Sequence, residues 1–256
     1  MGHMIEEVAL SRGHEIVCVI DTNPTPGSST DSHRQSDRAE LFTRSREGAK
    51  YYTPEDGFES EAFRSADVAI EFTTPATAEE NIRKAWAQGV PVISGSTGWK
   101  PEKLKIINYK LKMEDNKIVI TNEQGKVMLV WSSNFSVGVN IFFELNKFLA
   151  QKMKNLTPTL STREGGYTPS IKEIHHIHKL DKPSGTAKTL AEDLSLTLSQ
   201  GEGTKVSIES IREGEVPGTH EVTWDSEEDT IVITHIAKGR RGFALGAVLA
   251  AEKIVG

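Results

Sequence analysis

The chain has little of several features that mark particular classes of protein. Its 256 residues include one cysteine, Cys18, so no disulfide can form within the chain. No apolar run approaches the roughly 18 residues that cross a bilayer, and the N-terminus lacks the basic-then-apolar order of a signal peptide. We therefore expect a soluble, cytoplasmic protein without a membrane partner, in which Cys18 is a small buried hydrophobic residue.

Positive charge is also in deficit. The chain has 30 lysines and arginines against 36 aspartates and glutamates, which gives a formal net charge of −6. Because proteins that bind nucleic acids usually present a broad basic face, we expect no nucleic-acid partner. A local basic pocket inside an acidic protein would instead suit a small anion.

The order of strand-like and helix-like patterns predicts the fold class. In the first half, strand patterns lie at residues 15–20, 66–74, 90–93, 117–121 and 127–131, and helical patterns at 4–10, 76–88 and 101–114. This alternation predicts an α/β fold with a Rossmann-like, doubly wound parallel sheet. The segment 22–60 is polar and rich in Pro, Ser and Thr, so we expect a long loop or insertion there.

The second half predicts a different sheet. A long amphipathic helix over 137–155, which we expect to bridge two domains, is marked by Ile141, Leu145, Phe148 and Leu149. Strand patterns at 170–180, 206–212, 220–224 and 230–236 predict a mixed or antiparallel sheet, and an apolar helix follows at 244–254. We expect residues 1–133, completed by 238–256, to form one domain, and residues 134–237 to form a second domain of α+β class.

Reactive side chains are concentrated in residues 173–187, which read Glu-Ile-His-His-Ile-His-Lys-Leu-Asp-Lys-Pro-Ser-Gly-Thr-Ala. The β-branched residues before position 180 favour a strand, which Pro183 and Gly185 then break. Leucines four residues apart follow, and this spacing predicts a helix with Ser184 or Thr186 as its N-cap. The unit is therefore expected to be a strand, a polar turn and a helix.

This unit has the parts of a site for a small anion. The free backbone N–H groups of the first helical turn favour negative charge, and Lys179 and Lys182 add positive charge nearby. Alternate residues of a strand share a face, so His175 and Lys179 should point one way and His176 and His178 the other. One face could therefore hold an acid–base pair.

Other interpretations fit the same residues. Histidines are often ordinary polar residues with satisfied hydrogen bonds, but three of them within four positions beside two lysines favour a site. Zinc is commonly held by histidine, yet no cysteine or carboxylate lies at a convincing ligand spacing, so no metal is expected. Lysines also decorate exposed strand edges, and the turn at 183–186 argues against that interpretation.

The stretch 173–187 resembles the signature of the 4-hydroxy-tetrahydrodipicolinate reductase (dihydrodipicolinate reductase) family of bacterial lysine and diaminopimelate biosynthesis. Stretches similar to the family recur at 95–98 (Gly-Ser-Thr-Gly), 132–139 (Ser-Ser-Asn-Phe-Ser-Val-Gly-Val) and 240–243 (Arg-Arg-Gly-Phe), so the resemblance spans most of the chain. It implies a homotetramer that uses NADH or NADPH to reduce a small cyclic dicarboxylate, 4-hydroxy-tetrahydrodipicolinate, to tetrahydrodipicolinate. The second domain would then bind substrate and form the oligomer.

The resemblance also implies roles for individual residues. His175 matches the proton donor/acceptor of the family and Lys179 its proton donor. Addition of hydride to an unsaturated ring conjugated to an imine must be matched by a proton, so an acid within hydrogen-bond reach is required. His176, Gly185 and Thr186 match substrate-binding positions, where the last two would receive a carboxylate at the helix entrance.

The cofactor residues are less completely represented. In a dinucleotide-binding unit, a strand and a Gly-rich turn precede the first helix, and an acid about 20 residues later binds the adenosine ribose. Asp21 is placed for that role, and its carboxylate would favour NADH over NADPH. Met1 and Gly2 resemble only the tail of the Gly-rich turn, so we expect an incomplete sequence, with a truncated or degenerate domain as the alternative. The other cofactor contacts that the resemblance implies are Gly95, Ser96, Thr97, Ser132, Ser133, Asn134 and Phe135.

Some alternatives stay open from the sequence. Arg240 or Arg241, in a basic turn before the last helix, could clasp a dianion or hold the domains together. The chain could also be another amino-acid-pathway dehydrogenase on the same plan. A third possibility is a non-catalytic ligand-binding or scaffold protein that has lost its cofactor half.

Overall fold

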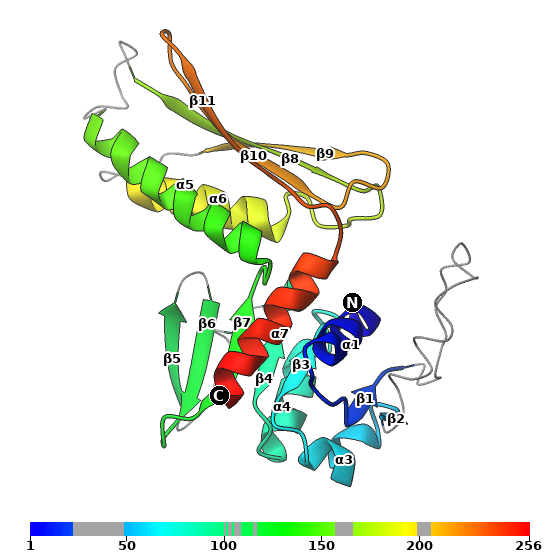
Figure 1. Ribbon diagram of the computed structural model, residues 1–256. Coiled ribbons are helices and arrows are strands. Elements are labelled where there is room, and N and C mark those ends of the chain that lie inside the picture. Colours follow the sequence, from blue (N-terminus) through cyan, green and yellow to red (C-terminus); the bar gives the residue numbers. More distant parts are fainter. Residues whose placement is uncertain are drawn as a thin grey trace. The chain divides into compact units, whose positions relative to one another are not determined.

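The computed structural model describes residues 1–22, 49–99, 101, 104, 109–114, 117–156, 166–198 and 206–256 (Figure 1). The chain divides into two compact units. The first comprises Met1–Ser132 together with Ala244–Gly256, and the second comprises Ser133–Phe243. Among the described residues, no helix combines the length and the apolar character that crossing a bilayer requires.

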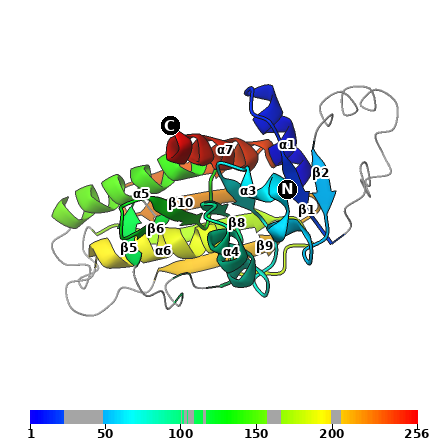
Figure 2. The ribbon, with the colours of Figure 1, turned by 90° about the horizontal axis from the view of Figure 1, so that it is seen from below.

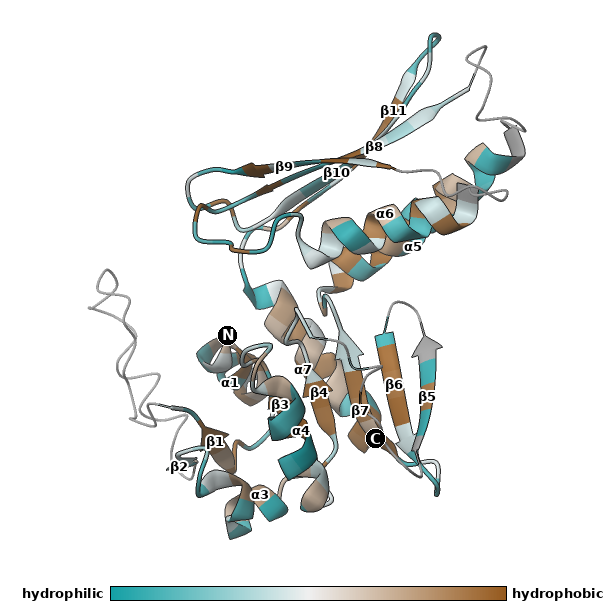
Figure 3. Cartoon of the chain, turned by 180° about the vertical axis from the view of Figure 1, so that it is seen from behind, coloured by the Kyte–Doolittle hydropathy of each residue, from teal (hydrophilic) through white to brown (hydrophobic). Residues whose placement is uncertain are grey.

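A five-stranded sheet lies at the centre of the first unit. Its strands, in spatial order, are β3 (Ala69–Glu71), β4 (Val92–Ser94), β7 (Val127–Ser132), β6 (Lys117–Asn122) and β5 (Tyr109–Glu114). The first three are parallel, and β6 and β5 continue the sheet antiparallel. Apolar runs are typical of parallel strands buried on both faces, and the hydrophobic colouring of the parallel strands β4 and β7 shows them (Figure 3).

Helices and a second pair of strands complete the first unit. These elements are α1 (Gly2–Ser11), the parallel pair β1 (Cys18–Ile20) and β2 (Lys50–Tyr52), η1 (Gly57–Glu59), α3 (Glu61–Arg64), α4 (Ala78–Ala87) and most of α7 (Arg241–Val255). Val8 of α1 packs with Ala244 and Val248 of α7 in one buried cluster. The α7 carboxylate of Glu252 lies 2.6 Å from Arg12 Nε, which joins the two chain ends of this unit.

The second unit is a four-stranded mixed sheet with two helices. Its strands lie in the order β11 (Thr230–Ile236), β10 (Thr219–Asp225), β8 (Thr168–His175) and β9 (Ser207–Arg212). β8 pairs antiparallel with β10 and parallel with β9. The helices α5 (Val137–Leu156) and α6 (Gly185–Leu198) lie side by side against one face (Figures 1 and 2). Phe143, Leu190 and Trp224 form the centre of this core and are fully buried.

The predicted fold class is confirmed: a Rossmann-like α/β unit and an α+β unit with a mixed sheet. Several local predictions are wrong. Residues 109–114 form strand β5 rather than helix, because they pair along their length with β6. The predicted loop 22–60 contains β2 and η1, while its residues 23–48 lie outside the described part. Cys18 is half-buried rather than buried.

The apolar face predicted for the long helix is wrong for three of its four residues. Ile141, Leu145 and Phe148 of α5 are exposed, whereas Phe142 and Phe143 are buried. The fourth residue, Leu149, does pack against the core. The buried face of α5 packs against α6 and β11. The periodicity of a single helix does not show which neighbours it packs against. The whole of α5 belongs to the second unit.

Candidate functional site

Strand β8 carries Glu173 and His175 into the interior of the second unit. Burial alternates along the strand, and both side chains lie on its buried face, 0% and 6% exposed. The antiparallel register places His220 of β10 directly opposite Glu173. His220 is also buried, so three ionisable groups lie together in the interior of this unit.

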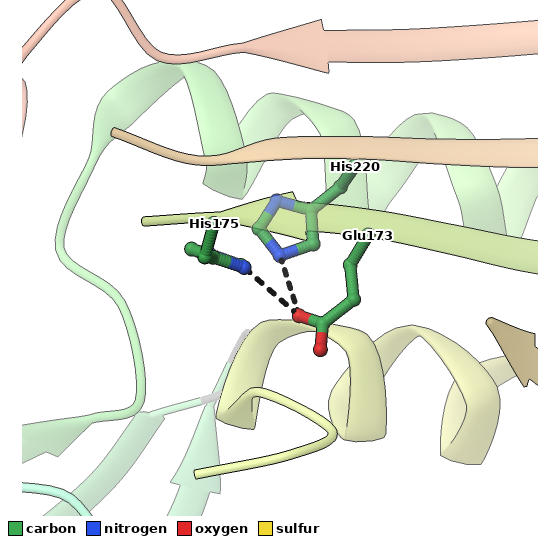
Figure 4. A group of neighbouring side chains, drawn as sticks. All are labelled: Glu173, His175 and His220. Atoms are coloured by element: carbon green, nitrogen blue, oxygen red, sulfur yellow. Dashed lines mark ion pairs between the residues drawn. The ribbon is translucent and has the colours of Figure 1, made fainter. Parts of the chain in front are cut away.

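One carboxylate connects four elements of the unit. Glu173 Oε2 lies 3.1 Å from His175 Nδ1 and 3.8 Å from His220 Nε2, as the dashed lines of Figure 4 show. Its other oxygen, Oε1, accepts a hydrogen bond from the backbone N–H of Ser184 (3.0 Å) and lies 3.2 Å from Arg212 Nη2. Strands β8, β9 and β10 and the start of α6 therefore converge on Glu173.

The surroundings determine which of these groups are charged. Burial by itself would raise the pKa of Glu173, but contacts with His175, Ser184 and Ser210 hold it well below its ordinary value. For His220, burial and then the neighbouring His175 lower the pKa to about 3. Near neutral pH the cluster therefore contains a carboxylate and a neutral His220.

This cluster could also be considered as a metal centre. The ligand atoms of Glu173, His175 and His220 lie within 4.8 Å of one another, and two imidazoles with one carboxylate are a donor set that zinc accepts. The guanidinium of Arg212, however, already gives the same carboxylate a positive partner at 3.2 Å. We interpret the cluster as a polar network within the protein rather than as a metal site.

The strand predicted over 170–180 ends at His175, and a turn follows. The backbone N–H of Lys179 donates to His176 O (3.1 Å), and Ile177 N–H donates to Gly214 O (3.1 Å) instead of continuing the ladder. The alternation predicted beyond His175 is therefore wrong. His175 is buried, whereas Lys179 lies in the turn with its side chain 25% exposed.

The turn binds a carboxylate of the chain itself. Lys179 Nζ lies 2.6 Å from Asp181 Oδ1. Burial would raise the pKa of Asp181, but Lys179 and the backbone N–H groups of Asp181 and Gly185 lower it. An ammonium group and the first backbone N–H of α6 thus hold one carboxylate between them, as expected for the positive end of a helix.

The entrance of α6 is built from residues predicted for two different roles. Ser184 Oγ accepts a hydrogen bond from Ala187 N–H (3.2 Å), so Ser184, rather than Thr186, is the N-cap. Thr186 Oγ1 instead accepts one from Asn134 Nδ2 (3.1 Å). A Cβ built on Gly185 would stand 3.8 Å from the Cβ of Ser133. The structure therefore brings the predicted cofactor residues Ser133 and Asn134 to the predicted substrate residues.

Basic side chains surround this entrance. The ring of His176 lies 6.1 Å from that of His178, although both belong to the turn rather than to a strand. Burial first, and then the positive charge of Arg240, lower the pKa of His176. Arg240 therefore acts on His176 through its charge, while Arg241 is the first residue of α7.

In the first unit, a buried acid supports the turn at 95–98. Ser96 Oγ donates to Glu71 Oε1 (2.7 Å) and accepts from Thr73 N–H (2.8 Å), and Ser94 Oγ lies 2.5 Å from Glu71 Oε2. A Cβ on Gly95 would stand 2.2 Å from the ring of Phe72, the residue after β3, so any other side chain at position 95 would displace that ring. The side chain of Ser96 faces the interior, and this turn can offer a ligand chiefly its backbone.

The remaining predicted cofactor residues occupy varied places. Met1 precedes α1 and accepts hydrogen bonds from Met4 and Ile5, whereas Asp21 is exposed just after β1. Ser132 ends β7 and is buried, and Phe135 is buried in the second unit. Thr97 is exposed in the turn after β4.

Sequence reasoning missed Glu71, Glu173, Arg212 and His220. One signal was present, since Glu173 and His175 are two apart in a strand and must share a face. His220 and Arg212 had no such signal, because their proximity depends on how β10 and β9 pair with β8.

Comparison with known proteins gives matches along the whole chain. Residues 1–135 match the family described as "Dihydrodipicolinate reductase, N-terminus", and residues 138–256 match "Dihydrodipicolinate reductase, C-terminus". The 4-hydroxy-tetrahydrodipicolinate reductase of Christiangramia forsetii is 37% identical over 98% of this chain and 87% of its own length. That of Methanoculleus marisnigri is 35% identical over 75% of this chain and 72% of its own.

A solved structure shares the fold. The dipicolinate-bound dihydrodipicolinate reductase from Paenisporosarcina sp. TG-14 superposes with a TM-score of 0.61 at 18% identity. The superposition covers 99% of this chain and 90% of that one. At this identity the likeness concerns the fold alone.

Proposed function

Because the chain belongs to the dihydrodipicolinate reductase family and is an NAD(P)H-dependent 4-hydroxy-tetrahydrodipicolinate reductase of lysine and diaminopimelate biosynthesis, we propose roles for its two halves. Residues 1–133 with 238–256 form the dinucleotide-binding domain. Residues 134–237 form the domain for substrate binding and oligomerisation. The nicotinamide, when bound, supplies the hydride, and the protein supplies position, charge and a proton.

The observation that carries the substrate assignment is the carboxylate of Asp181. It is held between Lys179 Nζ and the backbone N–H of Gly185, and this arrangement supports a carboxylate site at the entrance. A carboxylate of the cyclic substrate has the same charge and acceptor atoms. It binds at Gly185 and Thr186 in place of Asp181, and His176 contacts the same substrate.

Two groups at this entrance handle protons. His175 lies at the end of β8, one residue before the turn, and is the proton donor/acceptor. Lys179 delivers a proton to the ring position that gains electron density when hydride is added. A group that transfers a proton to the substrate must contact it, so His175 and Lys179 lie beside the carboxylate site in this proposal.

The experiment that tests the carboxylate site removes one N–H group. In Gly185→Pro the N–H is lost, yet proline is tolerated at the first position of a helix. We expect KM for the substrate and the inhibition constant of dipicolinate to rise about tenfold or more, as for loss of a charge-assisted hydrogen bond. Steady-state kinetics with both ligands measures this effect.

Gly185→Ala is the matched control. It keeps the N–H, and its Cβ would make an ordinary contact, 3.8 Å from Ser133. We expect it to bind both ligands within about twofold of the wild type, since nothing that binds a carboxylate is lost. Equal affinities in the proline and alanine variants would contradict the proposed site.

The cofactor contacts are Met1, Asp21, Gly95, Ser96, Thr97, Ser132, Ser133, Asn134 and Phe135. The proposal that these residues bind the nicotinamide cofactor is supported by the turn at 95–98. This turn follows the carboxyl end of the parallel strand β4, where doubly wound sheets bind ligands. Glu71 holds Ser96 inward, so the backbone of the turn is the contacting part.

Asp21 sets the cofactor preference in this proposal. A carboxylate accepts hydrogen bonds from a free ribose 2′-hydroxyl and repels a 2′-phosphate. We expect kcat/KM to be at least about tenfold higher with NADH than with NADPH, and Asp21→Ala to reduce that ratio mainly by improving NADPH use. Initial rates with the two cofactors measure the ratio. A clear NADPH preference in the wild type would overturn the assignment.

We also propose a cytoplasmic homotetramer. The edge strand β11 exposes Ile231, Val232 and Ile236, and burial of such apolar side chains would stabilise association. Light scattering on the purified protein would give the mass of four 28.2 kDa chains.

A further inference from the structure

We propose that Glu173 is the positioning residue of the proton-transfer site: its buried carboxylate orients His175 and, through its second oxygen, fixes the turn and helix that receive the substrate. This inference rests on the proposed role of His175. It assigns to Glu173 a task beyond that of a buried charge.

The first part of the argument is the orientation of the imidazole. His175 Nδ1 faces Glu173 Oε2 at 3.1 Å, a close charge contact although not a well-aligned hydrogen bond. A neutral ring in this place keeps its proton on Nδ1, because a carboxylate is only an acceptor. Nε2 is then the nitrogen left to exchange a proton with a ligand.

The other edge of the ring is kept clear by glycine. A Cβ on Gly218 would stand 3.1 Å from His175 Nε2, closer than side chains normally pack, and the φ of Gly218 is +152°. Any side chain there would press on the nitrogen that Glu173 leaves free. The two residues thus act on opposite edges of one imidazole.

The second part concerns the groups around His175. His220 of β10 lies beside it, with ring centroids 5.0 Å apart, and Arg212 of β9 reaches the far oxygen of Glu173. Burial lowers the pKa of His220 and keeps that ring neutral, so the ionised group at His175 Nδ1 is the Glu173 carboxylate.

The third part is the link to the substrate entrance. Glu173 Oε1 accepts from the backbone N–H of Ser184, the residue that caps α6. The same oxygen pairs with Arg212, whose guanidinium donates to the carbonyl oxygens of Lys179 (3.2 Å) and Asp181. One carboxylate therefore fixes the acid–base residue, the helix entrance and the turn that carries Lys179.

A buried acid that only balances Arg212 would also be expected to stabilise the fold. The two roles differ in what they change. Loss of a purely structural charge lowers the free energy of unfolding and leaves the tautomer of His175 unchanged. Loss of a positioning carboxylate moves the proton of His175 from Nδ1 towards Nε2 in a protein that is still folded.

The experiment compares Glu173→Gln with the wild type. Glutamine keeps the shape and an acceptor for Ser184 but removes the negative charge, and Arg212 keeps its carbonyl partners. In the wild type, ¹⁵N NMR of the neutral His175 ring should show the proton on Nδ1, and in Glu173→Gln we expect a substantial share of that proton to move to Nε2. The value of kcat/KM near neutral pH should fall about tenfold or more, with KM for NADH little changed.

Two variants complete the experiment. Glu173→Asp keeps the charge and should retain part of the Nδ1 preference and part of the activity, while Glu209→Gln removes an exposed carboxylate from β9 and should change neither readout. A folded Glu173→Gln protein with the wild-type tautomer of His175 would overturn the inference. If Glu173→Gln does not fold, Glu173→Asp decides: its longer gap to Nδ1 should weaken the Nδ1 preference, and an unchanged tautomer overturns the inference.

The tautomer of His175 separates this inference from the proposed function, because it is measured in the absence of turnover. A changed tautomer in Glu173→Gln together with full activity in a His175 variant would leave Glu173 as the partner of His175 but remove His175 from the reaction.

Discussion

Replacing His175 with glutamine is expected to lower kcat/KM by about 10²–10⁴-fold, the range for loss of a positioned general acid–base group. Glutamine fills a similar volume and can still donate to Glu173, so the buried carboxylate keeps a partner. It cannot, however, exchange a proton near neutral pH. Initial rates over a range of pH should show the loss together with a flattened profile.

His178→Gln is the matched control for this prediction. His178 is three residues further along, its side chain is 69% exposed, and it pairs with Glu215 at the surface. We expect it to retain activity within about twofold, since surface substitutions away from a site usually have small effects. If His175→Gln behaved like His178→Gln, His175 would not take part in proton transfer.

Replacing Lys179 with alanine is expected to lower kcat/KM by about 10²–10⁴-fold as well. The loss has two sources, because Lys179 both donates the proton and holds a carboxylate at the entrance of α6. The first lowers kcat and the second raises KM, so both constants should change. Separate measurement of kcat and KM for the dicarboxylate substrate tests whether Lys179 contributes to both proton transfer and substrate binding.

Lys188→Ala provides the comparison for Lys179→Ala. Lys188 is exposed on α6, one turn beyond the entrance, and the structure gives it no part in the site. A Lys179→Ala enzyme as active as the Lys188→Ala enzyme would instead favour another dehydrogenase chemistry on the same fold.

Much of the site could be predicted from local patterns. The two-residue period of a strand predicted that His175 and His176 point to opposite faces, and the Pro-Ser-Gly-Thr turn predicted where the helix begins. Leu190 and Leu194, four residues apart, are both fully buried on α6. These features depend on residues close together in the chain.

The rest depends on pairing between distant segments. β8 ends at His175 because Glu213 N–H donates to His175 O and Ile177 N–H donates to Gly214 O, some 37 to 38 residues away. The partners of Glu173 come from β9, β10 and α6. These contacts join distant segments and leave no periodic pattern in the sequence. The sequence therefore predicted a role for His175 but none for Glu173, Arg212 and His220.

The buried face of α5 illustrates the same limit. Ile141 and Phe142 are both apolar, and the helical period alone supports a stripe through either one. Only packing against α6 and β11 decides that Phe142 is buried and Ile141 exposed.

A structure of the protein with dipicolinate, a flat dicarboxylate, tests the account most directly. The account predicts one carboxylate at the backbone N–H of Gly185 and at Lys179 Nζ, with Asp181 displaced, and His175 within hydrogen-bond reach of the ligand. Dipicolinate bound elsewhere in the second unit, with Asp181 still joined to Lys179 and Gly185, would contradict it.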